Sequence, residues 1–134
     1  MTIVLDSSVA VAALIDTGSI GEWAESILGS GAVAAPHLMP AEVANILRRS
    51  VAAGAVTADV ASLAHAEMMA RRIELFPYTP FASRVWDLRR NVTSYDAWYV
   101  ALAESLQVPL VTLDGRLALA TGPRCEFIVP PAAT

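Results

Sequence analysis

Several features that define common protein classes are missing from this sequence. The chain has one cysteine, Cys125, so it cannot form an internal disulfide, which favours a cytoplasmic protein. It has no lysine, because all nine basic residues are arginine. No run of about 18 apolar residues free of charge occurs, so we expect no membrane span. The first residues lack a basic segment and reach Asp6 at once, so we expect no signal peptide.

The composition is more apolar than a small domain can easily bury. The 134 residues are 55% hydrophobic and 16% charged, with a mean hydropathy of +0.51 and a formal net charge of −4. A chain of this length predicts one domain over residues 1–134. Exposed apolar surface marks interfaces, so we expect a homodimer, a protein partner, or both.

Short apolar runs alternate with longer segments that have the pattern of helices. This alternation predicts an α/β fold, with a mainly parallel sheet covered by helices on both faces as a three-layer α/β/α sandwich. Expected helix caps are Ser19, Thr57 and Ser94. Trp86 and Trp98 occupy helical positions and are expected in the core. The expected strands are 2–5, 32–35, 73–76, 110–113 and 127–129, and the expected helices are 9–14, 20–28, 40–53, one that Thr57 caps, 80–90, 95–106 and 115–120.

Four acidic residues stand at the ends of these elements. Asp6 and Asp114 follow two expected strands, while Glu42 and Asp96 lie in the first turns of two expected helices. Functional sites of open α/β sheets form beyond the carboxyl ends of the strands, so one edge of the sheet can hold all four. Carboxylates gathered there would repel one another unless a cation joined them. Oxygen ligands suit Mg²⁺ and Mn²⁺, ions that promote phosphodiester hydrolysis.

Taken singly, each acid has an ordinary interpretation. Asp6 fits a helix-capping role as well as a functional one. Glu42 fits a charge that complements a helix dipole, and Asp96 fits a capping acid beside Ser94. Asp114, before a glycine, fits a turn. The order of the four acids and their setting between strands and helices is what favours a shared site.

Two other chemistries at an aspartate after the first strand are disfavoured. A phosphatase of the haloacid-dehalogenase type needs a second acid two residues later, where this chain has Ser8. A receiver domain needs a lysine on a late loop, and this chain has none. The sequence also shows no Gly-rich phosphate loop, Cys-x-x-Cys pair or Ser-His-Asp motif.

The blocks around the four acids resemble those of the PIN-domain ribonucleases, most closely the VapC toxins of bacterial toxin–antitoxin pairs. The matching blocks span nearly the whole chain, and the Tyr-Asp-Ala block followed by Thr-x-Asp is the most specific. They are Ile3-Val4-Leu5-Asp6-Ser7-Ser8, Glu42-Val43-Ala44-Asn45-Ile46-Leu47, Ser94-Tyr95-Asp96-Ala97-Trp98-Tyr99-Val100-Ala101-Leu102-Ala103-Glu104 and Val111-Thr112-Leu113-Asp114.

The resemblance implies cleavage of single-stranded RNA by a Mg²⁺-dependent endoribonuclease, with Mn²⁺ as an alternative ion, and inhibition by a VapB-like antitoxin. It implies that Asp6, Glu42, Asp96 and Asp114 are the catalytic acids. Asp6 and Asp96 would bind the principal ion directly, with Glu42 and Asp114 closing the site. Thr112 resembles the hydroxyl residue that supports this site.

Three further polar residues lie near the acids in sequence. Many relatives carry another acid where this chain has Arg116, so one tightly held ion is expected rather than two. Asn45 lies one helical turn after Glu42 and either orients it, touches a bound water or is an ordinary polar residue at the edge of the core. Arg49 and Arg116 are candidates to contact RNA phosphate or an antitoxin, with surface ion pairing and solvation as the alternatives.

A second hypothesis remains open for the whole chain. A PIN-like domain without catalytic activity could use the same acids to dock a nucleic acid or a protein. Binding of a divalent ion would distinguish the two, because only the enzyme hypothesis requires it.

Overall fold

The computed structural model describes residues 1–132, so residues 133–134 of the expected domain lie outside it. A five-stranded sheet forms its centre, with the strand order β3-β2-β1-β4-β5. All neighbouring strands are parallel. The strands are β1 (Thr2–Leu5), β2 (Ala32–Pro36), β3 (Ile73–Phe76), β4 (Leu110–Val111) and β5 (Phe127–Ile128).

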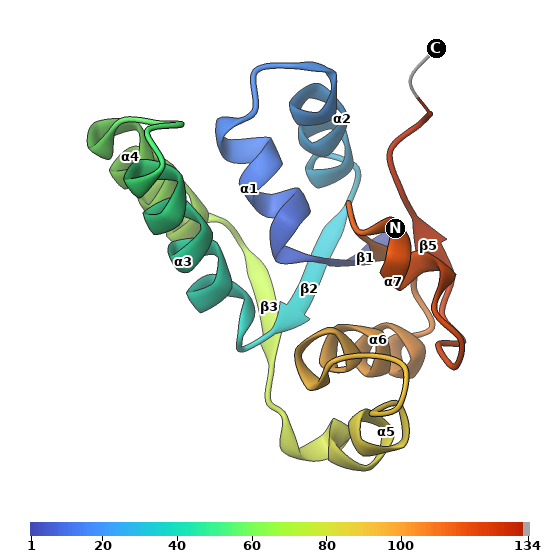
Figure 1. Ribbon diagram of the computed structural model, residues 1–134. Coiled ribbons are helices and arrows are strands. Elements are labelled where there is room, and N and C mark those ends of the chain that lie inside the picture. The colour runs from blue at the N-terminus through green and yellow to red at the C-terminus, as the bar shows by residue number, and fades with distance from the viewer. Residues whose placement is uncertain (133–134) are drawn as a thin grey trace.

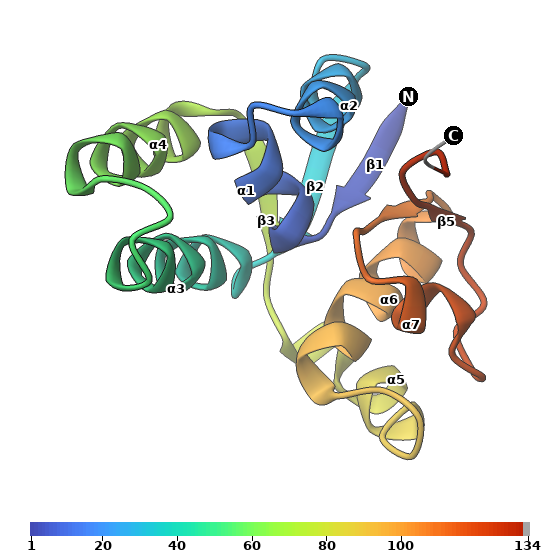
Figure 2. The same ribbon diagram turned by 45° about the horizontal axis from the view of Figure 1, so that its top comes forward.

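Helices cover both faces of this sheet, which confirms the predicted three-layer α/β/α architecture. α1 and α2 lie on one side and α5 and α6 on the other, while α3 and α4 form a hairpin that extends away from the sheet (Figures 1 and 2). The helices are α1 (Ser7–Ile15), α2 (Ser19–Leu28), α3 (Met39–Ala52), α4 (Ala58–Ala70), α5 (Ala82–Asp87), α6 (Ser94–Leu106) and α7 (Gly115–Leu119).

The strand order reverses between β1 and β4. From β1 the chain moves outward to β2 and β3, and it then returns to the other side of β1 to form β4. Parallel α/β sheets bind ligands at such a reversal, beyond the carboxyl ends of the strands, because the loops there diverge to opposite faces. Asp6 follows β1 and Thr112 follows β4, so both residues stand at this point.

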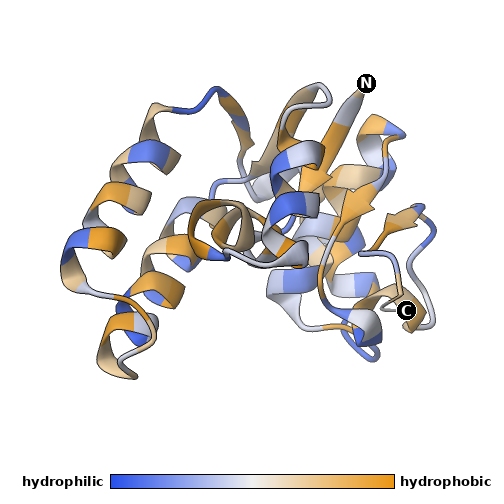
Figure 3. Ribbon diagram, turned by 90° about the horizontal axis from the view of Figure 1, so that it is seen from above, coloured by the Kyte–Doolittle hydropathy of each residue, from blue (hydrophilic) through white to orange (hydrophobic). Residues whose placement is uncertain are grey.

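The core lies on both faces of the central strand. Ile3, Val4 and Leu5 of β1 are each at most 1% exposed. α6 packs against β1, β2 and β4, and its apolar side chains from Tyr99 to Ala103 are all buried. Hydrophobic colour predominates in the strands, while the hairpin of α3 and α4 alternates between hydrophobic and hydrophilic bands (Figure 3). No helix within residues 1–132 is long and apolar enough to cross a membrane.

The helix predicted over 80–90 is wrong in its length. The structure divides it into a 3-10 turn, Thr79–Phe81, and the short helix α5, which ends at Asp87. The Trp86 carbonyl accepts from the Arg89 N–H at 3.2 Å and from the Arg89 side chain at 2.9 Å, so it is satisfied without a further turn of α-helix. The same guanidinium lies 4.5 Å from the Trp86 ring centre. Trp86 is 62% exposed, which contradicts its expected place in the core.

Helix caps agree with the sequence at one position and differ at two. Thr57 caps α4 as predicted, since its hydroxyl accepts from Val60 N at 3.2 Å. For α6 the cap is Thr93 rather than Ser94, with its hydroxyl accepting from Asp96 N at 3.1 Å. α2 begins at Ser19 after Gly18 and has no side-chain cap.

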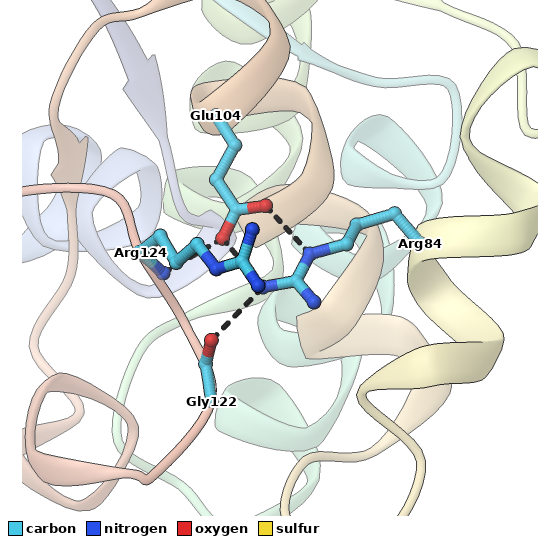
Figure 4. A network of polar contacts seen from close by, with 4 residues as sticks. All are labelled: Arg84, Glu104, Gly122 and Arg124. Carbon is cyan, nitrogen blue, oxygen red and sulfur yellow. Dashed lines mark hydrogen bonds and ion pairs between the residues drawn. The ribbon is translucent and has the colours of Figure 1, made fainter.

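A polar network joins α5, α6 and the segment before β5 (Figure 4). Arg84 donates through Nε to Oε1 of Glu104 at 2.7 Å and through Nη2 to Oε2 at 3.1 Å. The same Nη2 donates to the Gly122 carbonyl at 2.9 Å, and Arg124 N donates to Glu104 Oε2 at 2.7 Å. Burial opposes ionisation of Glu104, but the hydrogen bonds from Arg84 and Arg124 outweigh it and lower its pKa. The network fixes the C-terminal segment to the helical layer.

Candidate functional site

Asp6 ends β1 and is held by hydroxyl groups. Its Oδ2 accepts from Ser8 Oγ and from Thr112 Oγ1, each at 2.8 Å. Its Oδ1 has only a long contact of 3.4 Å from Ser7 Oγ. Although Asp6 precedes α1, its side chain makes no capping hydrogen bond. The capping interpretation of Asp6 is therefore wrong, and its carboxylate faces the end of β4 instead.

Thr112 connects the ends of β1 and β4. This residue is fully buried, and its hydroxyl donates to Asp6 and accepts from Asp114 N at 3.0 Å. The next residue, Leu113, donates its N–H to Ser8 Oγ at 3.3 Å rather than to a strand. β4 therefore stops at Val111, two residues before the predicted end of the strand. The resulting turn brings Asp114 to the same edge as Asp6.

Asp114 combines a structural contact with an available oxygen. Its Oδ1 accepts from Arg116 N at 2.9 Å and from Leu117 N at 3.2 Å, which caps α7. Its Oδ2 has no hydrogen bond within residues 1–132. Helix capping therefore accounts for Oδ1 of Asp114, while Oδ2 is left available beside the site.

Glu42 lies in the first turn of α3 and meets α6. Its Oε1 accepts a 2.6 Å hydrogen bond from the hydroxyl of Tyr99. Burial raises the pKa of Glu42, the Tyr99 hydrogen bond opposes this, and the charges of Asp6 and Asp96 raise it further. Burial and Glu42 also raise the pKa of Tyr99 far above its ordinary range, so its hydroxyl remains a donor.

Asp96 lies in the first turn of α6 and has the least protein support. Thr93 bonds to its backbone N–H, so the Asp96 side chain does not cap the helix. Within residues 1–132 the only side chain that acts on its carboxylate as a hydrogen-bonding group is Thr93. Burial raises its pKa, and the charges of Asp6 and Asp114 raise it further.

The four acids thus share one electrostatic environment. The charge of Asp6 helps to raise the pKa values of both Glu42 and Asp96. The charge of Asp114 also helps to raise the pKa of Asp96. The only ion pair within residues 1–132 joins Arg84 to Glu104, so no arginine in this range neutralises the four acids. No three acidic, histidine or cysteine side chains in the same range are gathered closely enough to form a ready metal site. The carboxylates surround the edge and repel one another across it.

The other predicted residues lie farther out. Asn45 is exposed and accepts from Arg48 Nε at 3.0 Å, so within residues 1–132 it makes no hydrogen bond to Glu42. Arg49 and Arg116 are both exposed, on α3 and α7. Arg116 lies two residues after Asp114, and its own N–H binds that carboxylate.

Sequence reasoning missed two residues of this arrangement. Ser8 binds both Asp6 and Leu113, and Tyr99 binds Glu42. The signal for Tyr99 was its spacing, because a residue three positions after Asp96 shares its helix face. No pattern within α1 distinguishes Ser8 from a solvated serine, since its partner Leu113 is 105 residues away.

Comparison with known proteins gives a consistent group of relatives. Residues 3–122 match the model of the PIN domain family. Ribonuclease VapC1 of Mycobacterium tuberculosis is 40% identical over 125 residues, which cover 92% of this chain and 94% of the relative. Ribonuclease VapC9 of the same species is 34% identical over 129 residues, covering 96% and 98%.

Solved structures share the fold. VapBC-5 from Mycobacterium tuberculosis, described as a member of the VapBC family of toxin-antitoxin systems, has 28% identity and a TM-score of 0.59, covering 96% of this chain and 98% of that one. The Sarcin-Ricin loop cleaving toxin VapC20 of the same species has a TM-score of 0.67 at 16% identity, covering 87% and 93%. The second likeness concerns the fold alone.

Proposed function

The chain belongs to the PIN-domain family, among its VapC-type ribonucleases, and from this premise we propose that it cleaves single-stranded RNA as the toxin of a toxin–antitoxin pair. The observation that carries the proposal is the set of four acids at the strand-order reversal, with Asp6 held by Ser8 and Thr112. We assign Asp6, Glu42, Asp96 and Asp114 as the catalytic acids.

The chemistry of the donor set suits a hard divalent ion, although within residues 1–132 the side chains are not gathered into a ready metal cluster. All four side chains are carboxylates, they repel one another, and no arginine within residues 1–132 pairs with them. Oxygen-only sites suit Mg²⁺ and Mn²⁺ rather than Zn²⁺, which favours histidine and cysteine. Asp6 and Asp96 would hold the ion, with Glu42 and Asp114 completing the set. When bound, such an ion neutralises phosphate charge, activates water and orients the leaving group.

The residues of the chain then have separate tasks. Thr112 and Ser8 keep Asp6 Oδ2 fixed, so that Oδ1 faces the site. The start of α7 fixes Asp114 in the same way. In the metal-free protein burial raises the pKa values of Glu42 and Asp96. One of the four carboxylates would accept the proton of the attacking water.

Arginine side chains near the four acids would bind the RNA phosphates. Arg116 follows Asp114 and is exposed beside the site, and Arg49 is exposed on α3. Guanidinium groups bind phosphate in a bidentate manner and supply affinity without reading sequence. Asn45, which accepts from Arg48, would act by touching a bound water rather than by holding Glu42 directly.

A VapB-like antitoxin is the proposed protein partner, and a homodimer the proposed assembly. α4 exposes Val60, Leu63 and Met69 by 44%, 72% and 61%. Side chains of this kind exposed on one short helix favour an interface. The relative VapBC-5 is described as part of a toxin–antitoxin system. We also propose that residues 1–134 form a single domain and that the protein works in the cytoplasm.

RNA cleavage under metal control tests the proposed activity. Purified protein is incubated with single-stranded RNA after EDTA treatment, and Mg²⁺, Mn²⁺ or Ca²⁺ is then restored separately. We expect no cleavage in EDTA, recovery with Mg²⁺ or Mn²⁺, and little with Ca²⁺, whose larger and more flexible coordination suits the site less well. Cleavage that persists in EDTA would contradict the proposal.

The non-catalytic alternative makes a different prediction. An inactive docking module requires no divalent ion, so calorimetric titration with Mg²⁺ would show no binding heat. Binding of Mg²⁺ together with RNA cleavage excludes this alternative. Binding of RNA without either effect would favour it.

A further inference from the structure

A buried tyrosine reaches the acidic site from the hydrophobic core. Tyr99 is 1% exposed and ranks among the largest fully buried side chains of residues 1–132. It lies on α6 three residues after Asp96, on the same helix face. Its hydroxyl donates a 2.6 Å hydrogen bond to Glu42 Oε1, which joins α6 to α3 across 57 residues of sequence.

Packing does not account for the hydroxyl group. A phenylalanine would fill the same volume among apolar neighbours without placing a polar atom there. A buried hydroxyl is unfavourable unless it is hydrogen-bonded, and this one binds the Glu42 carboxylate at 2.6 Å, with the Ser7 hydroxyl as a second hydrogen-bonding neighbour. The hydroxyl of Tyr99 therefore serves to fix the position of the Glu42 side chain rather than to fill the core.

The same division of oxygens recurs at three of the acids. Glu42 binds Tyr99 through Oε1 at 2.6 Å, and the Ser7 hydroxyl also acts on its carboxylate as a hydrogen-bonding group. Asp6 is held firmly through Oδ2, and Asp114 is held through Oδ1. In each of these carboxylates the protein holds one oxygen by short hydrogen bonds, and the second oxygen is less firmly held. Mg²⁺ demands near-ideal octahedral geometry, which favours carboxylates already oriented.

We propose that Tyr99 is a positioning residue that holds Glu42 by one oxygen so that the other faces the divalent ion. The inference rests on the proposed function, since it assigns a role toward the same ion. Because Tyr99 and Asp96 share α6, the bond also fixes Glu42 relative to Asp96. Tyr99 itself touches neither the ion nor the RNA.

Mg²⁺ affinity tests the role directly. Calorimetry on metal-free protein compares wild type, Tyr99→Phe and Tyr95→Phe, which removes a hydroxyl from the neighbouring exposed ring. Partners that orient a metal ligand typically contribute about 10–100-fold in affinity, so Tyr99→Phe should weaken Mg²⁺ binding by about 10-fold or more. Tyr95→Phe should bind as wild type does.

A double-mutant comparison separates positioning from general loss of structure. In a Glu42→Gln background, Tyr99→Phe should cause no further loss of Mg²⁺ affinity, because the carboxylate through which Tyr99 would act on the ion has been removed. Cleavage by Tyr99→Phe should recover at saturating Mg²⁺, which a folding defect would not allow. If Tyr99→Phe fails to fold, Tyr99→Met in both backgrounds provides the same comparison.

The outcomes divide clearly. Equal Mg²⁺ affinity of Tyr99→Phe and wild type overturns the inference while leaving the proposed function intact. Equal losses in the wild-type and Glu42→Gln backgrounds, or in Tyr95→Phe, overturn it as well. Failure of the wild-type protein to bind Mg²⁺ overturns the proposed function together with this inference. The wild-type titration therefore distinguishes a failure of the proposed function from a failure of the role assigned to Tyr99.

Discussion

The hydroxyl of Thr112 donates a 2.8 Å hydrogen bond to Oδ2 of Asp6, across 106 residues of sequence. The same hydroxyl accepts from Asp114 N, so one buried group orients two acids. Thr112→Val keeps the shape and removes the hydroxyl. We expect a loss of about 1–3 kcal/mol in unfolding free energy, since the buried Asp6 carboxylate loses one of its two short hydrogen bonds and the partly buried Asp114 N–H loses its partner.

Urea denaturation measures the effect of Thr112→Val, with Thr112→Ser as the matched control that keeps the hydroxyl. Cleavage at low Mg²⁺ should fall in Thr112→Val and be largely kept in Thr112→Ser. If the valine variant matched wild type in both stability and cleavage, Thr112 would have no role in orienting Asp6.

Asp96 should destabilise the metal-free fold at neutral pH. Its folded pKa is raised above the ordinary value of 3.8, chiefly by burial, then by Asp6 and Asp114. The folded state therefore binds the proton more tightly than the unfolded state, and stability falls as pH rises from that value through the folded pKa. In EDTA at neutral pH, Asp96→Asn should be more stable than wild type, and this advantage should shrink on acidification.

Thermal unfolding of wild type and Asp96→Asn, with EDTA and with Mg²⁺, measures this effect. Mg²⁺ should stabilise wild type more than the variant, because it relieves the repulsion that the substitution has already reduced. A wild type that is the more stable protein in EDTA at neutral pH would contradict the assigned cause.

Glu104 should affect stability without affecting the site. It binds Arg84 and Arg124 N near the C-terminal end of α6 (Figure 4). Asp96 lies at the N-terminal end of the same helix. Glu104→Gln weakens these charge-assisted hydrogen bonds and should cost about 1–3 kcal/mol of stability. RNA cleavage well below the melting temperature should remain close to wild type. A selective loss of cleavage would place Glu104 in the catalytic site.

Arg116 should contribute to RNA binding through charge. Arg116→Ala should weaken binding to all single-stranded RNA sequences to a similar extent and should reduce the salt dependence of binding. Arg72→Ala is the matched control, because Arg72 directly precedes β3 and so lies at the amino ends of the strands, opposite the carboxyl ends where Asp6 and Asp114 stand. Filter binding over a range of salt concentrations separates the two variants. Equal behaviour of both variants would remove Arg116 from the interface.

The sequence predicted the elements that depend on local pattern. The run from Ile3 to Leu5 and the apolar helix after Asp96 were placed correctly, because consecutive apolar residues predict that a segment is buried. The four acids followed from the ends of these elements. Distant contacts carried less signal: no pattern pointed to Ser8 and only the spacing from Asp96 pointed to Tyr99, so both residues were missed. The contact of Asn45 depended on its neighbour Arg48.

Errors in the prediction also had local physical causes. The segment 80–90 looked helical, yet Arg89 closes α5 early through the Trp86 carbonyl and covers the Trp86 ring. β4 was predicted too long because the Leu113 N–H binds a serine from another element instead of a strand. At β4 a side chain replaces the backbone partner that a regular strand would supply. At α5 the Arg89 side chain adds to a tighter backbone turn, in which the Arg89 N–H also binds the Trp86 carbonyl.

The central claim is that the acids at the strand-order reversal perform the cleavage. The most direct measurement is the rate of single-stranded RNA cleavage at saturating Mg²⁺ by wild type, Asp6→Asn, Asp96→Asn and Asp59→Asn. Asp59 is an exposed aspartate on α4, so its variant controls for the same chemical change away from the site. We predict wild-type rates for Asp59→Asn and a loss of at least about 100-fold for the other two variants, as when a group that stabilises the transition state is removed. Cleavage by Asp6→Asn and Asp96→Asn at the wild-type rate would contradict the account.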